Sequence, residues 1–137
     1  MTISRNLSSI PNTITANTII DSTGNTVPIA TVVKGAAKAW VRFVGATGSI
    51  YGSFNVASIT RNGTGDYSIN FTTAMPNANY ATVGSGGDTG GVASATPTYV
   101  RPCNANTTFT RIGVGYASGG TQALYDYESI SVSVFSS

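Results

Sequence analysis

Hydrophobic and polar side chains alternate along much of the chain, and the first clear alternation covers residues 37–43. A period of two is typical of a β-strand, whose side chains point in turn to its two faces. The same pattern recurs over residues 129–135. We therefore expect half-buried strands in both segments. In the first of them the two faces would carry Ala39, Val41 and Phe43 against Lys38, Trp40 and Arg42.

Turn residues separate the other alternating segments and predict one hairpin in detail. A strand is expected over residues 49–60, and the pair Asn62-Gly63 after it suits both central positions of a type I′ turn, so residues 67–71 should return as its partner. Further strands are expected over residues 80–83, 98–101, 107–116 and 123–127. This spacing predicts an all-β fold with helix close to absent: a single antiparallel, jelly-roll-like β-sandwich of about seven or eight strands over residues 36–137.

The first 35 residues differ from the rest, because Ser, Thr and Asn surround isolated apolar residues and two prolines interrupt the segment. We expect residues 1–35 to form an extended N-terminal arm that attaches the protein to another chain. An arm of this kind needs a partner to hold it in place. The residues expected to make the contact are its apolar ones: Ile3, Leu7, Ile10, Ile14, Ile19 and Ile20.

Composition narrows the class of protein. Ser, Thr, Asn and Gly make up 63 of the 137 residues, and only 9% are charged, against roughly a quarter in typical globular domains. The net charge of +2 is spread thinly, so we expect no nucleic acid as a partner. No apolar run approaches the roughly 20 residues of a membrane-spanning helix, so we expect no membrane insertion.

The residues needed for catalysis are mostly missing. The chain contains no histidine, which excludes Ser-His-Asp and Cys-His arrangements. Asp126 and Glu128 are the only carboxylates close in sequence; on one strand face they would form a solvated acidic edge, with glycoside hydrolysis or half of a calcium site as the alternatives. We expect no enzyme, no metal site and no cofactor.

Three other features are candidates for function. Residues 84–91 read as a glycine-rich loop that could face outward for recognition, through Gly86, Gly87, Asp88 and Thr89. Trp40 and Arg42 share the polar face of their strand, which favours a subunit interface, although aromatic rings also stack on sugars. Cys103, the single cysteine, is expected to be buried or half-buried, with an exposed reactive thiol as the alternative.

Residues 37–80 resemble a module found in the tail fibres of bacteriophages. The likeness lies in Ala37-Lys38-Ala39-Trp40-Val41-Arg42-Phe43, in the segment 48–60, and in Arg61-Asn62-Gly63-Thr64-Gly65-Asp66-Tyr67 continuing to Pro76 and Tyr80. The resemblance implies a β-rich unit, usually trimeric, that is displayed on the virion and brings no catalytic residues.

The expected function is accordingly that of a virion structural protein on the surface of the phage particle. It would form homotrimers, contact other virion proteins, and bind a host surface glycan or protein through outward loops. A capsid decoration or cement protein that stabilises the phage head is the first alternative, and a free lectin-like module is the second. These alternatives differ in whether the arm or the loops supply the binding energy.

Overall fold

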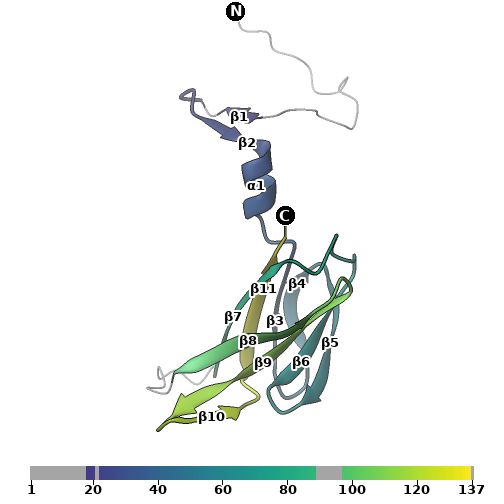
Figure 1. Cartoon of the computed structure of the whole chain (residues 1–137), viewed down its shortest axis with the longest axis vertical. Coiled ribbons are helices and arrows are strands. Elements are labelled where there is room, and N and C mark those ends of the chain that lie inside the picture. Colours follow the sequence, from purple (N-terminus) through teal and green to yellow (C-terminus); the bar gives the residue numbers. More distant parts are fainter. Residues whose placement is uncertain (1–17, 21, 89–96, 137) are drawn as a thin grey trace, which may run out of the picture. The chain divides into compact units, whose positions relative to one another are not determined.

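A computed structural model describes residues 18–20, 22–88 and 97–136. The chain divides into two compact units, residues 1–35 and 36–137. In the first unit, β1 (Thr18–Ile20) pairs antiparallel with β2 (Thr26–Pro28), and α1 (Ile29–Gly35) follows directly. Figure 1 shows these elements in chain order. Among the described residues, no helix has the length and apolar character needed to cross a membrane.

The first unit is therefore not simply extended, and the expectation of an extended arm is wrong for residues 18–20 and 22–35, which hold a strand pair and a helix. Its helix went unpredicted because α1 has only seven residues, several of them β-branched, and such residues have weak helix propensity. Signals of the helix ends are nevertheless present: Pro28 stands immediately before it, Lys34 lies in its last turn, and Gly35 ends it. The fold as a whole remains all-β.

The second unit consists of two antiparallel sheets packed face to face, as in a β-sandwich (Figure 1). One sheet has four strands in the order β4-β3-β11-β7. In the other, β9 pairs with β8, β6 and β10, and β5 adds to β6. The four strands of the first sheet are β3 (Ala39–Phe43), β4 (Ile50–Phe54), β7 (Ala81–Gly87) and β11 (Ser129–Phe135). The five strands of the second are β5 (Val56–Gly63), β6 (Asp66–Phe71), β8 (Thr98–Ala105), β9 (Phe109–Ser118) and β10 (Thr121–Leu124).

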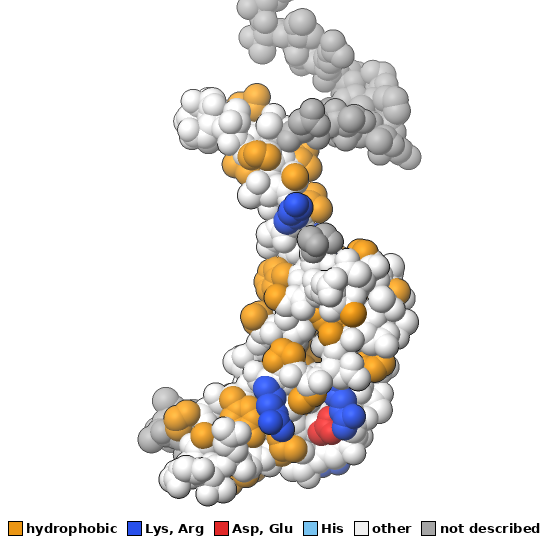
Figure 2. All heavy atoms as spheres, in the orientation of Figure 1, with side chains coloured by type: hydrophobic (Ala, Val, Ile, Leu, Met, Phe, Trp, Pro, Cys, Tyr) orange, Lys and Arg blue, Asp and Glu red, His pale blue; other side chains and the backbone are white. Residues whose placement is uncertain are grey.

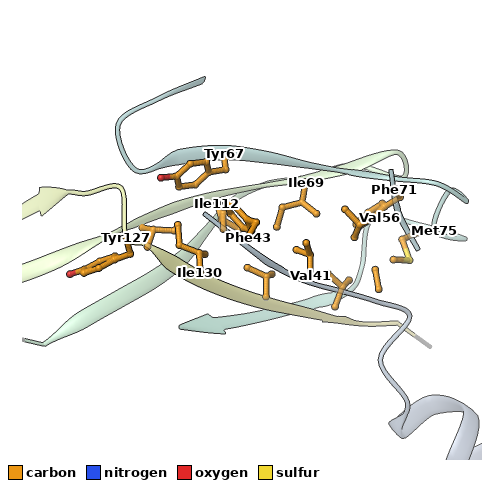
Figure 3. Packing of buried hydrophobic residues seen from close by; sticks show 14 residues of the cluster. Val41, Phe43, Val56, Tyr67, Ile69, Phe71, Met75, Ile112, Tyr127 and Ile130 are labelled. Atoms are coloured by element: carbon orange, nitrogen blue, oxygen red, sulfur yellow. The ribbon is translucent and has the colours of Figure 1, made fainter. Parts of the chain in front are cut away.

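The core lies between the two sheets and confirms the alternation read from the sequence. Phe43 of β3 meets Tyr67 of β6 edge to face, with ring centroids 5.1 Å apart, and both side chains are fully buried. Figure 3 shows the two layers of side chains pointing toward each other. The buried apolar residues are Ala39, Val41, Phe43, Val56, Tyr67, Ile69, Phe71, Met75, Ile112, Val114, Tyr127, Ile130, Val132 and Val134.

The single strand expected over residues 49–60 is instead two strands, β4 and β5, which belong to different sheets. Asn55 separates them with a φ of 54°, the left-handed conformation that asparagine tolerates better than most residues. Its side-chain amide donates to the carbonyls of Lys38 and Thr73, both at 3.1 Å, and its Oδ1 accepts from the Thr73 amide at 2.7 Å. Asn55 is thus the corner at which the chain crosses from one layer to the other. This crossing is one reason that the sandwich has more strands than expected.

The hairpin predicted around residues 62–63 exists between β5 and β6, but its turn lies two residues later. Gly63 pairs with Asp66, so Thr64 and Gly65 are the two loop residues, and Gly65 has the positive φ of 62°. A register shift between Arg61 and Gly63 accommodates the displacement. The glycine at position 65 can take this conformation without a Cβ clash.

Candidate functional site

The outer face of the four-stranded sheet carries a row of exposed apolar side chains. In the strand register, Phe54 of β4 lies opposite Trp40 of β3, Trp40 lies opposite Ser133 of β11, and Ser133 lies opposite Val83 of β7. Directly paired residues share a face, so these four side chains cross the sheet in one line. Phe54, Trp40 and Val83 are 56%, 43% and 54% exposed. Soluble monomers rarely expose contiguous apolar side chains in this way, and where they do, the patch marks an interaction site.

Arg42 lies on the same face, in the next row. Its guanidinium stacks over the ring of Tyr51 at 5.0 Å from the centroid, and its Nε donates to Ser129 Oγ at 2.9 Å. Gly52 lies opposite Arg42, and a Cβ there would be 3.6 Å from the Trp40 ring, so the indole rests against bare backbone. We call this surface the Trp40 face, defined by Trp40, Arg42, Tyr51, Phe54 and Val83.

The structure thus brings Trp40 and Arg42 together on an exposed surface, and it adds residues that the sequence did not single out. Phe54 and Val83 were missed because their orientation depends on the pairing of β4 with β3 and of β7 with β11. Tyr51 lies beside a register shift between Arg42 and Phe43, which strict alternation does not foresee. The sequence signal that could have pointed to these residues is that the chain has more large apolar side chains than its core buries.

Two of the proposed arm residues lie in the described part of the first unit. Ile19 and Ile20 of β1 are 52% and 63% exposed, and Val33 of α1 is also exposed. No residue of α1 is buried. The other four, Ile3, Leu7, Ile10 and Ile14, fall outside the described residues.

The expectation of a loop over residues 84–91 is wrong for its first half, which is strand. Gly86 and Gly87 belong to β7 and pair with Ile130 and Ser129 of β11. Gly86 is required by packing, since a Cβ there would approach the Tyr127 ring and Val114 Cγ1 to 2.8 and 2.9 Å. Asp88 is exposed and accepts a hydrogen bond from the Glu128 amide at 3.3 Å, while Thr89 lies outside the described residues.

Asp126 does not form an acidic pair with Glu128 on a strand, because β10 ends at Leu124. Its carboxylate instead accepts hydrogen bonds from Arg61 Nη2 at 2.5 Å, from the Gly65 amide at 2.8 Å, and from the Tyr67 hydroxyl. Burial opposes ionisation of Asp126, but these donors outweigh it and lower the pKa of the carboxyl below its usual value. The residue therefore ties the β5–β6 turn to the loop before β11.

The other described residues include few groups that could bind a metal or react. No group of three or more His, Cys, Asp or Glu side chains in the described ranges could hold a metal ion. Cys103 is exposed on β8, contrary to the expectation of a buried or half-buried thiol. Asp66 and Arg111 form a second ion pair on the outer face of the five-stranded sheet, with Nη2 and Oδ2 at 2.5 Å.

Comparison with protein-family models, with curated proteins and with solved structures finds no match to this chain. The arrangement of its own residues is therefore the basis for assigning a function.

Proposed function

We propose that this protein is a non-enzymatic structural component of a bacteriophage virion: a tail-fibre-like, jelly-roll-like surface module that forms trimers through its Trp40 face. The observation that carries the assembly part is the exposed row of Phe54, Trp40 and Val83. The likeness of residues 37–80 to tail-fibre modules supports the location on a phage particle and leaves host binding as a further role of the assembled module.

The energetics of the Trp40 face favour a protein partner. Covering apolar surface is worth about 25 cal/mol per Å², and Trp and Tyr are the residues that most often dominate interfaces. The guanidinium of Arg42 stacks on Tyr51 and donates a hydrogen bond to Ser129, so covering the face leaves fewer of its donors without an acceptor. Ser85, Ser131 and Ser133 place small hydroxyl side chains at other outward positions of β7 and β11.

A second copy of the chain is the partner that best fits this surface. The face combines rings, small hydroxyls and a single guanidinium, so two copies bring little like charge together. An interface of this kind resembles the apolar centre of homo-oligomer contacts, which is depleted in charged residues. Trimeric association would remove Phe54, Trp40 and Val83 from water in every subunit.

We expect the full-length protein to sediment at three times the mass of one chain, and the double variant Trp40→Ser/Phe54→Ser to sediment as monomer. Truncating a central aromatic residue of an interface costs about 2 kcal/mol or more, so two truncations lower the association constant by at least about a thousandfold. Leu124→Ser is the matched control, because Leu124 is 40% exposed on the opposite sheet. A monomeric wild type, or a double variant that remains trimeric, contradicts the assembly proposal.

The first unit supports attachment to a larger particle. A seven-residue helix is marginal in water by itself, and α1 has no buried residue. Together with the exposed Ile19 and Ile20, this argues that a partner covers the unit in the assembled particle. The same observation favours the second candidate function, a capsid decoration or cement protein, in which the first unit would clamp the phage head.

Immunogold labelling of intact virions distinguishes the two functions. We expect gold at the tail; labelling over the head would favour the cement protein, and unlabelled particles would contradict both. The variant Ile19→Ser/Ile20→Ser should lower the labelling several-fold, because it removes exposed apolar side chains of the first unit and leaves the sequence of the sandwich unchanged. Thr26→Ser, on the paired strand β2, is the control and should label like wild type.

A further inference from the structure

A hollow of about 320 Å³ lies on the outer face of the five-stranded sheet, away from the Trp40 face. Its floor is Gly113 of β9, which is flanked in register by Asp66 of β6 on one side and Arg101 of β8 on the other. A Cβ at position 113 would lie 2.9 Å from Arg101 Nε and 3.4 Å from Cys103 Sγ, so the glycine lets the Arg101 side chain lie close over the β9 backbone at the hollow. Figure 2 shows basic and acidic side chains side by side, next to apolar ones, over this sheet.

One of the two guanidinium groups beside the hollow has no salt bridge among the described residues, although it lies near enough to Asp66 to favour the ionised carboxylate. Arg111 engages Asp66 through two hydrogen bonds, Nε to Oδ1 at 2.8 Å and Nη2 to Oδ2 at 2.5 Å. The bonds from Arg111 lower the pKa of Asp66, so its carboxylate is ionised and neutralised at neutral pH. Arg101 forms no salt bridge within the described residues. The hollow therefore carries a net single positive charge at the side where Arg101 lies.

The rest of the lining can bind a neutral, hydroxyl-rich ring. Asn104 offers both an amide donor and a carbonyl acceptor. Oδ1 of Asp66 accepts from Arg111 and Asn62, whereas Oδ2 accepts from Arg111 and keeps a lone pair for a hydroxyl. Leu124 adds an apolar wall, since it pairs with Gly115 on the side of β9 where β6 lies. The volume is at the lower end of the range of small-molecule sites, which suits one sugar ring.

We propose that this hollow binds a monosaccharide unit that carries a carboxylate, such as a uronic acid, with Arg101 holding the carboxylate. A monoanion matches the site better than a phosphate dianion, because the second charge of a dianion would face the ionised Asp66. A saccharide matches it better than an acidic peptide, because the hollow lies on the face of the sheet, where side chains and not a row of unpaired backbone amides would meet the ligand. This site does not depend on trimer formation or on a place in the virion.

The first test compares two sugars that differ only in the carboxylate. In calorimetric or NMR titrations of the full-length protein, we expect methyl β-D-glucuronide to bind at least about tenfold more tightly than methyl β-D-glucoside, since a hydrogen bond between charged groups contributes about 1.5 kcal/mol or more. N-acetylglutamate amide serves as the peptide arm and should bind no better than the glucoside. Equal binding of both sugars overturns the role of Arg101, and tighter binding of the glutamate compound overturns the saccharide assignment.

Variants and a thiol reporter locate the site. Arg101→Gln should remove the preference for the glucuronide, and Gly113→Ala should reduce it, because the new Cβ would lie 2.9 Å from Arg101 Nε and displace the guanidinium. Lys34→Gln, outside the sandwich, removes the same charge and should bind like wild type.

Cys103 is the single cysteine and lines the hollow, so saturating glucuronide should slow its reaction with a thiol reagent several-fold. Unchanged preference in Arg101→Gln, or unchanged thiol reactivity, contradicts the proposal. If Trp40→Ser/Phe54→Ser monomers still bind the glucuronide, the site is independent of assembly.

Discussion

Replacement of Gly115 by alanine is expected to destabilise the sandwich by about 3 kcal/mol, the upper end of the cost of overpacking a close-packed site. Gly115 is buried in β9, where it pairs with Tyr99 of β8 and with Leu124 of β10. A Cβ there would overlap the carbonyl oxygen of Ala123 and lie 2.7 Å from the Tyr99 hydroxyl. Because backbone occupies one side of this space, rotamer changes cannot relieve the clash.

Chemical denaturation measures this prediction directly, and Gly87→Ala is its matched control. Gly87 is also a strand glycine, but a Cβ there would have no neighbour within 4 Å among the residues that the structure describes. We expect the control to unfold within about 0.5 kcal/mol of wild type, as surface substitutions do. If Gly115→Ala is as stable as the control, Ala123 of β10 and Tyr99 of β8 do not approach Gly115 this closely.

Replacement of Asp126 by alanine is expected to cost about 3 kcal/mol. The change leaves the hydroxyl of Tyr67, a fully buried residue, and the amide of Gly65 without their acceptor, and each unsatisfied group costs about 1–3 kcal/mol. Asp126→Asn keeps one acceptor oxygen and should lose less. The measurement is again the free energy of unfolding, with Asp88→Asn as the control at an exposed carboxylate.

The same carboxylate predicts how stability depends on pH. Although burial opposes its ionisation, the bonds from Arg61, Gly65 and Tyr67 lower the folded pKa of Asp126 below its unfolded value near 4. A depressed folded pKa stabilises the protein above the unfolded pKa, and this stability is lost as the pH falls through the folded pKa. The acid limb of the unfolding curve should therefore be shallower in Asp126→Asn than in wild type or Asp88→Asn.

Tyr67 imposes the opposite limit at alkaline pH. Burial, followed by the bond to Asp126, raises the pKa of its hydroxyl. Because the unfolded tyrosine releases its proton near pH 10 while the folded one keeps it, stability should fall as the pH rises above about 10. Between these limbs we expect little change, since the chain contains no histidine to titrate near neutrality.

Local pattern predicted the elements that need only their own residues. The inward positions of β3 and β11 follow from alternation, and the β5–β6 hairpin follows from the glycines between two alternating segments. The turn within that hairpin was misplaced by two residues, because Asn62-Gly63 and Thr64-Gly65 are both plausible turns and only the register with β9 selects one. The helix α1 was missed because its composition favours a strand.

The candidate sites were less accessible from sequence. Trp40 was identified because it stood on the polar face of a clear strand, but Phe54 and Val83 join it only through strand pairing. The hollow around Gly113 joins residues of β6, β8, β9 and β10 and left no local motif. Asp126 looked like part of a solvated edge because its donors come from β5 and β6, about sixty residues earlier in the chain.

By itself, then, the sequence determined that the second unit is built from antiparallel strands with one buried face, because a period of two has only one regular structure that uses it. Only the tertiary structure decided which strands share a sheet, since Asn55 sends two adjacent strands to opposite layers through a single left-handed residue. The register of strand pairing then decided which side chains lie together on the outer face of each sheet. A shift of one residue would turn Trp40 inward, and with the observed register Trp40, Phe54 and Val83 are exposed together. On the other sheet, register brings Asp66 and Arg101 to either side of Gly113, where the hollow lies.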